Sequence, residues 1–203
     1  MKKNEIPLHP LPVRIWHWVN AALIFLLIAT GAQLRFMDIR IFGDYTFTVA
    51  IHKYTGYGLT VSFFFWIAAY QILGGFAGHY LVSAKDIRSL PAQVSYYIYG
   101  YFRGGPNPFN PTPQTRFNVL QKFTYAFMMF IAMPVIIITG ILFGNIMEFY
   151  RLLHAIGGLR VLDAIHVIVG YLFVIYLLVH LYMATVGKTL FYHTKSMING
   201  HKE

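Results

Sequence analysis

Residues 164–187 read AIHVIVGYLFVIYLLVHLYMATVG, a stretch of 24 residues without one acidic, lysine or arginine side chain. A helix of about 20 apolar residues crosses the roughly 30 Å hydrocarbon core of a bilayer. The stretch holds His166 and His180, which are 14 residues apart. On an α-helix this interval is about 21 Å of rise and returns the side chain to within about 40° of its starting direction. The stretch therefore predicts a membrane helix with a histidine near each end, both on one face.

Three further stretches of similar length also lack charged residues, namely 15–34, 54–84 and 123–147. The whole chain is 57% hydrophobic and only 11% charged, whereas a soluble globular domain carries about 25% charged residues. We therefore expect an all-α membrane protein, a four-transmembrane-helix bundle that forms a single domain over residues 1–203. The expected helices are 14–34, 47–75, 118–144 and 160–187, with a helix lying in the membrane interface at about 85–103.

The sixteen basic residues indicate how these helices are oriented. Eleven fall on one side of the expected membrane: Lys2, Lys3, Arg14, Lys85, Arg88, Arg103, Arg116, Lys122, Lys188, Lys195 and Lys202. Five fall on the other: Arg35, Arg40, Lys53, Arg151 and Arg160. The positive-inside rule then puts both termini in the cytoplasm, with the chain as a multi-pass protein of the cytoplasmic membrane. The same rule accounts for the net charge of +9, so we expect membrane lipid and no nucleic acid as a partner.

The absence of cysteine limits the possible redox chemistry. A chain with no cysteine has no covalent c-type haem, no thiolate-bound iron–sulfur cluster and no disulfide. Any metal or haem ligands would have to be histidines.

Four histidines fall within or at the ends of the apolar stretches: His17, His52, His166 and His180. With the topology above, His17 and His180 lie at the cytoplasmic side, and His52 and His166 at the periplasmic side. Because an isolated membrane histidine is as often an interhelical hydrogen-bonding group as a ligand, one alone would carry little weight. Two pairs matched by depth predict axial ligands of two haems b.

The fourth residue after each of these histidines is small: Ala21, Gly56, Gly170 and Ala184. Residues four apart share a helix face, so a flat macrocycle could approach the backbone there, although glycine and alanine are common in membrane helices anyway. The remaining histidines are expected outside the core: His154, which lies about 39 Å from His180 if helical, and His9, His79, His193 and His201.

Haem propionates need cationic or polar partners. The candidates are Lys53, Arg151 and Arg160 outside and Arg14, Lys122 and Lys188 inside. Each is equally explained as an interfacial anchor whose charge reaches the headgroups.

These residues resemble the cytochrome b (gamma) subunit of membrane-bound formate dehydrogenase. The wider family includes the b-type cytochromes of nickel–iron hydrogenase and the cytochrome b of thiosulfate reductase. The resemblance rests on His17-Trp18, on His52 with Gly56, on the 14-residue histidine spacing and on the run HLYMA at 180–184. Phe117-Asn118 and Gln121-Lys122 resemble the family's element at the start of its third helix, with Leu120 where that element has glycine. The segment SMING at 196–200 resembles the family's tail.

The resemblance implies two haems b and a site for menaquinone or another quinone beside the cytoplasmic-side haem. Carried over, that site would involve Asn118, Gln121, Lys122 and His180. The same polar residues could instead cap the third helix at the interface.

The expected function is electron transfer between the quinone pool and a periplasmic redox subunit carrying iron–sulfur clusters or c-type haems. The chain would be the electron-transfer subunit of a respiratory oxidoreductase complex, with no catalytic residue of its own. Two alternatives remain, a non-redox membrane anchor of a periplasmic enzyme and a small permease with histidines in a proton path.

Overall fold

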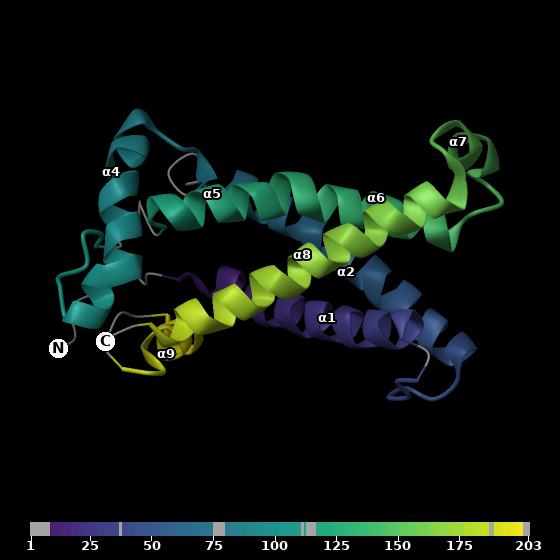
Figure 1. Cartoon of the computed structure of the whole chain (residues 1–203), viewed down its shortest axis with the longest axis horizontal. Coiled ribbons are helices and arrows are strands. Elements are labelled where there is room, and N and C mark those ends of the chain that lie inside the picture. Colours follow the sequence, from purple (N-terminus) through teal and green to yellow (C-terminus); the bar gives the residue numbers. More distant parts are fainter. Residues whose placement is uncertain are drawn as a thin grey trace.

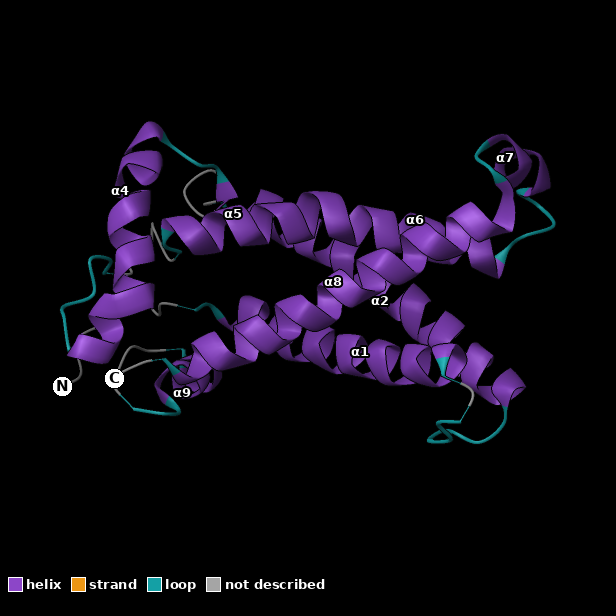
Figure 2. Ribbon diagram, viewed as in Figure 1, coloured by secondary structure: helices purple, strands orange, loops and turns teal. Residues whose placement is uncertain are grey.

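The computed structural model describes residues 9–36, 38–74, 80–110, 112, 117–186 and 189–200. Within these ranges every regular element is helical, as Figure 2 shows, which confirms the all-α fold. Four long helical segments run along the length of the molecule (Figure 1). They are α1 (Leu11–Arg35), α2 (Tyr45–Leu73), the continuous α5–η3–α6 segment (Val119–Gly144) and α8 (Gly158–Thr185).

Shorter helices cover the two ends of these long segments (Figure 1). At one end lie α4 (Ala84–Ser95) and α9 (Tyr192–Asn199), and α4 continues through η1 (Tyr96–Gly100) and η2 (Tyr101–Arg103). At the other end lies α7 (Tyr150–Ala155). We call the end with α4 and α9 the inner end and the end with α7 the outer end. The sequence pattern indicated neither α7 nor α9, because both are too short to show a clear hydropathy signal.

Three helices of the described part of the chain are long and apolar enough to cross a membrane: α1, α5–η3–α6 and α8. Many large apolar side chains on these helices are exposed, such as Phe25, Ile138 and Leu178. Such exposure is expected where lipid replaces water as the surrounding solvent. The helix expected over 47–75 is present as α2, and its role as a fourth span stays a prediction.

The third long segment is not a regular α-helix throughout. Its middle turn, η3 (Met128–Ala132), is a π-turn that immediately precedes Met133 and Pro134. Proline has no N–H and its ring crowds the carbonyl four residues earlier, and one inserted residue in a π-turn accommodates such a break without ending the helix. The predicted helix 118–144 therefore exists with a local irregularity that apolar periodicity does not reveal.

Side-chain hydrogen bonds fix the register of α2 against α1. Trp16 Nε1 donates to the Ser62 carbonyl at 3.0 Å, near the inner end. At the outer end the buried Gln33 donates to Thr48 Oγ1 at 2.8 Å. The main core includes Trp66, which is 2% exposed and lies about one turn nearer the inner end than Ser62. Polar contacts at both ends thus hold the two helices at one height.

The first and last described helices meet at the inner end. The Arg14 guanidinium donates to the Ile198 carbonyl in the last turn of α9, and the His9 N–H donates to the Gly200 carbonyl at 3.2 Å. Gly200 ends α9 at φ +85°, and a Cβ there would lie 3.2 Å from Arg14 Cζ and 3.0 Å from the His9 carbonyl oxygen. Only glycine suits this position, both for its backbone angle and for the space available.

Candidate functional site

The four histidines of the apolar stretches meet in two pairs, at opposite ends of the long helices. The ring centroids of His17 on α1 and His180 on α8 are 6.1 Å apart. Those of His52 on α2 and His166 on α8 are 6.2 Å apart. These are the pairs that the helix directions predict. We call His17 and His180 the inner pair, and His52 and His166 the outer pair.

The separation within each pair suits two imidazoles bound to one metal from opposite sides. With metal–nitrogen bonds of about 2 Å and roughly 1.1 Å from a ring nitrogen to the ring centre, the two centroids would be about 6.2 Å apart. Among the described residues, no group of three or more histidine and acidic side chains could hold a metal ion. Two protein ligands suffice for haem, because the macrocycle supplies the other four.

The outer pair is held by two buried threonines. Thr30 Oγ1 on α1 lies 2.8 Å from Nδ1 of His52, and Thr139 Oγ1 on α6 lies 2.8 Å from Nδ1 of His166. Each threonine is followed by a glycine, at Gly31 and at Gly140. Each outer ring is thus fixed by a threonine on a neighbouring helix.

Glycines leave space beside the outer pair. A Cβ at Gly56 or at Gly170, four residues after His52 and His166, would meet no described atom within 4 Å. A flat group bound between the two rings would extend along these helix faces, since residues four apart share a face. Gly56 and Gly170, two of the four small residues picked out in the sequence, therefore border open space, as a macrocycle requires.

The inner pair has a different setting. His17 Nδ1 is buried and has no hydrogen-bond partner among the described residues. The ring of Tyr176 stacks on that of His180, with centroids 5.7 Å apart and planes inclined by 22°. Among the described residues, no threonine contact like those of the outer pair is found at the inner pair.

The polar residues at the start of α5 form a helix cap. Asn118 is the N-cap residue, its side chain accepts from the Gln121 N–H at 3.0 Å, and Gln121 Oε1 accepts from the Asn118 N–H at 3.0 Å. Asn118 Nδ2 also donates to Tyr97 Oη at 3.0 Å. This is the capping alternative raised by the sequence, and the cap still leaves the Asn118 amide facing Tyr97.

Lys122 is buried in an ion pair. Its side chain is 6% exposed, and Nζ lies 2.9 Å from a carboxylate oxygen of Asp86 on α4. Ser83, which caps α4, donates to the same carboxylate. Burial raises the pKa of Asp86, but the hydrogen bonds from Ser83 and Lys122 outweigh that effect and lower it. The interfacial helix is therefore tied to the start of α5 by a charged contact.

Two of the other candidate propionate partners also have protein partners. Lys53 Nζ donates to the Gly144 carbonyl at the end of α6, at 3.0 Å, and Arg14 binds the end of α9. A cation at a helix C-terminus is favourable because carbonyl groups are unpaired there. Arg151 and Arg160 are exposed, and Lys188 lies outside the described residues.

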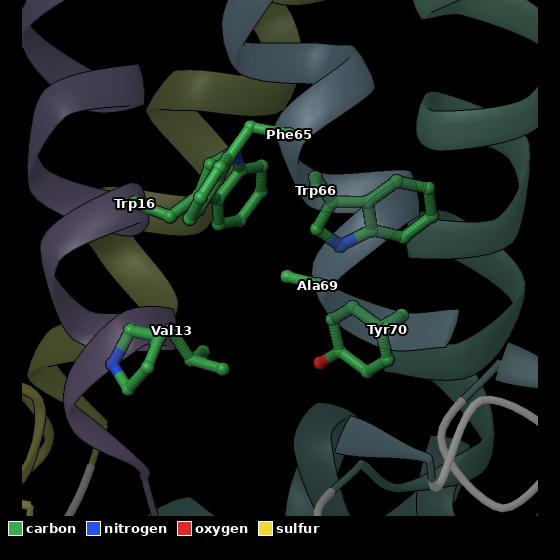
Figure 3. Close-up of a pocket in the computed structure, with 7 residues that line it drawn as sticks. Val13, Trp16, Phe65, Trp66, Ala69 and Tyr70 are labelled. Carbon is green, nitrogen blue, oxygen red and sulfur yellow. The ribbon is translucent and has the colours of Figure 1, made fainter. Parts of the chain in front are cut away.

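Neither of two cavities in the described part of the chain is lined by the four histidines. The first, of about 10 Å³, lies between α1 and α2 where Trp16 faces Trp66 and Tyr70 (Figure 3). It has room for no more than about one water molecule. The second, of about 430 Å³, lies at the outer end and is lined by Gln33, Ile39, Arg40, Gly43, Asp44 and Tyr45.

Histidine pairs that face each other between long apolar helices suit b-type haem, and b-type membrane cytochromes are a class of protein with such sites. Residues 8–200 match the family described as prokaryotic cytochrome b561, and the chain belongs to that family. It is also similar to the Escherichia coli protein named "Putative cytochrome YdhU". The two are 28% identical over 204 residues, covering 98% of this chain and 75% of that protein. The family confirms the resemblance to b-type cytochromes and implies b-type haem and electron transfer in a bacterial membrane.

Sequence reasoning missed Thr30, Thr139 and Asp86. The two threonines carry a shared but unspecific signal: a Thr-Gly dipeptide occurs in three apolar stretches, at 30–31, 55–56 and 139–140, and the first and third are the ones that contact a histidine. The spacing Ser83-x-x-Asp86 marks Asp86 as part of a capping box, but nothing in the sequence marks its pairing with Lys122, which lies 36 residues away on another helix.

Proposed function

We propose that the chain is a dihaem cytochrome b subunit of the bacterial cytoplasmic membrane, transferring electrons between a periplasmic redox partner and the quinone pool. The observation that carries the proposal is the presence of two histidine pairs at opposite ends of the long helices, with ring centroids 6.1 and 6.2 Å apart. His17 with His180 would hold one haem b, and His52 with His166 the other. In this proposal α2 is the fourth span and both termini are cytoplasmic.

Bound haem b would supply a one-electron carrier at each pair. The protein's part is to hold the pairs apart along α8, where 14 residues amount to about 21 Å of rise. Apolar side chains of the core lie between the two levels, Phe173 among them. They exclude water from the interior, so the carriers are kept in a medium of low dielectric constant.

For quinone we propose exchange at the inner end, beside His180 and the start of α5. The support is the polar contact between Asn118 and Tyr97 near the expected interface. Burial raises the pKa of Tyr97 above its usual value, although the hydrogen bond from Asn118 acts in the opposite direction. A neutral phenol and an amide are suitable donors to a quinone oxygen. Lys122 is already paired with Asp86, so contact with quinone would fall to Asn118 and Gln121.

Haem analysis of the purified protein tests the proposal. A pyridine haemochrome assay is expected to give two b-type haems per chain, and the reduced-minus-oxidised spectrum should show b-type bands. His154→Ala is the matched control, because His154 is an exposed histidine of α7 and should leave the haem content unchanged. One haem per chain would refute the pairing. No haem absorbance at all would favour the membrane anchor instead.

A further inference from the structure

We propose that Thr30 and Thr139 are positioning residues that hold the outer histidines in one tautomer and so lower the reduction potential of the outer haem. The inference rests on the proposed function, since it assumes that His52 and His166 bind haem iron. It goes beyond that function because it assigns to two threonines a property of only one of the two sites.

The direction of each threonine–histidine hydrogen bond follows from counting protons. A hydroxyl group has one proton to donate. Thr30 Oγ1 lies 2.7 Å from the Leu26 carbonyl oxygen, and Thr139 Oγ1 lies 2.7 Å from that of Val135. A carbonyl oxygen only accepts, so each hydroxyl proton is used there. Each threonine oxygen must therefore accept from the histidine, and Nδ1 must carry the hydrogen.

The tautomer with hydrogen on Nδ1 leaves the lone pair of Nε2 free. This is the form of neutral imidazole that binds a metal through Nε2, and the partner of Nδ1–H fixes the ring orientation. Thr30 is 0% exposed and Thr139 is 6% exposed, so water does not compete for either bond. The threonines thus select the state of the ring that ligation needs.

The glycine after each threonine completes the arrangement. A Cβ at Gly31 would lie 3.5 Å from Cε1 of His52, and a Cβ at Gly140 would lie 3.5 Å from Cε1 of His166. Each ring therefore lies against the neighbouring backbone, at van der Waals distance from the position that a Cβ would occupy. Two unrelated helix pairs, α1 with α2 and α6 with α8, repeat one Thr-Gly contact with a histidine.

Within the part of the chain that the structure describes, the threonine–histidine contact is present at the outer end alone. His17 Nδ1 has no partner among the described residues, so the inner pair lacks the arrangement. An acceptor at Nδ1–H makes imidazole a stronger electron donor. A stronger donor stabilises oxidised iron and lowers its reduction potential, and a hydrogen bond to the ligating side chain is one way in which a protein tunes haem.

Spectroelectrochemical titration of the intact protein in detergent tests the inference. Thr30→Val and Thr139→Val keep the side-chain shape and remove the acceptor. Each is expected to shift the reduction equilibrium of the outer haem about tenfold toward the reduced form, which is ~59 mV for one electron. The inner haem should be unchanged, and loss of one spectral component in His52→Ala identifies which haem is the outer one.

Two further variants give the controls. Thr124→Val removes a hydroxyl that donates to the Leu120 carbonyl at 2.8 Å, the same intrahelical bond without a histidine, and both potentials should stay as in the parent protein. Thr30→Ser and Thr139→Ser retain the acceptor and should retain the potential.

Each result decides the inference. Loss of the outer haem in the valine variants, with retention in the serine variants, would support it because the hydroxyl is then what the site requires. Unchanged potentials in the valine variants, or equal haem loss in valine and serine variants, would overturn it. Those results leave two haems in the parent protein and so leave the proposed function standing, whereas a parent protein without haem would overturn both.

Discussion

At the scale of single residues, the histidines and the Asp86–Lys122 pair have the most specific consequences. Each histidine faces a partner on a different helix, so removing either member of a pair should have the same effect. The ion pair joins a nearly buried lysine to a carboxylate with additional partners. Removing the lysine and removing the carboxylate should therefore lower the free energy of unfolding by different amounts.

Replacement of single histidines should remove the haems in a fixed pattern. We expect His52→Ala and His166→Ala to abolish the same spectral component and His17→Ala and His180→Ala to abolish the other, because haem held by two axial ligands is weakened by loss of either. Low-temperature difference spectra of the purified variants measure this. Loss of the same component from His17→Ala and His52→Ala would contradict the pairing.

Asp86→Ala should destabilise the protein more than Lys122→Ala. The first change leaves the lysine, 6% exposed, as an unpaired buried charge, which costs about 3–5 kcal/mol. The second leaves a carboxylate that is 18% exposed and still bonded to Ser83, at about 1–2 kcal/mol. Thermal unfolding in detergent, followed by circular dichroism, compares them. Equal losses would show that burial of the lysine does not matter.

The Asp86–Lys122 pair also predicts that the stability of the folded protein depends on pH. The pKa of Asp86 is lower in the folded protein than its usual 3.8. The ionised carboxylate therefore contributes fully to the free energy of unfolding at any pH well above 3.8. The contribution is lost as the pH falls through the lowered pKa. Below about pH 4, the parent protein should lose more stability than Asp86→Asn, which has no carboxylate to protonate. Parallel acid-induced losses in the two proteins would assign the sensitivity to other groups.

At the scale of elements, the start of α5 combines a helix cap with the proposed quinone contact. Asn118→Ser keeps an oxygen for the Gln121 N–H and so keeps the cap, but it removes the amide that faces Tyr97. Loss of one hydrogen bond of ~1.4 kcal/mol should slow electron exchange with a menaquinone analogue about tenfold while both haem spectra stay intact. Stopped-flow oxidation of the reduced protein measures it.

The control for this variant is a cap at the other end of the molecule. Asp44 caps α2 through the Phe47 N–H at 2.7 Å, so Asp44→Ala should cost about 1 kcal/mol of stability without affecting quinone exchange. If Asn118→Ser and a further Gln121→Ala change together left exchange at the parent rate, the inner-end site would have to be abandoned.

At the scale of the whole molecule, hydropathy predicted the long helices within a few residues, as 14–34 against Leu11–Arg35 shows. Hydropathy succeeded because every helix that spans a membrane needs about 20 consecutive residues that are mostly apolar. The histidine pairs followed from counting rise and direction along those helices. Contacts such as Thr30 with His52, 22 residues apart, could not be predicted, because periodicity within one helix says nothing about which residue faces it from another.

The closure of α9 onto the start of α1 bears on how the protein opens. Helix ends near chain termini usually fray first and exchange their amide hydrogens fastest. Here Arg14 and the His9 N–H hold the end of α9 against the first turn of α1. We expect hydrogen–deuterium exchange in detergent to be slower in that first turn than in α7, which is exposed over most of its length. In Gly200→Val the contacts of Arg14 and His9 with the end of α9 should be lost. Fast hydrogen exchange should then spread along α1 toward His17.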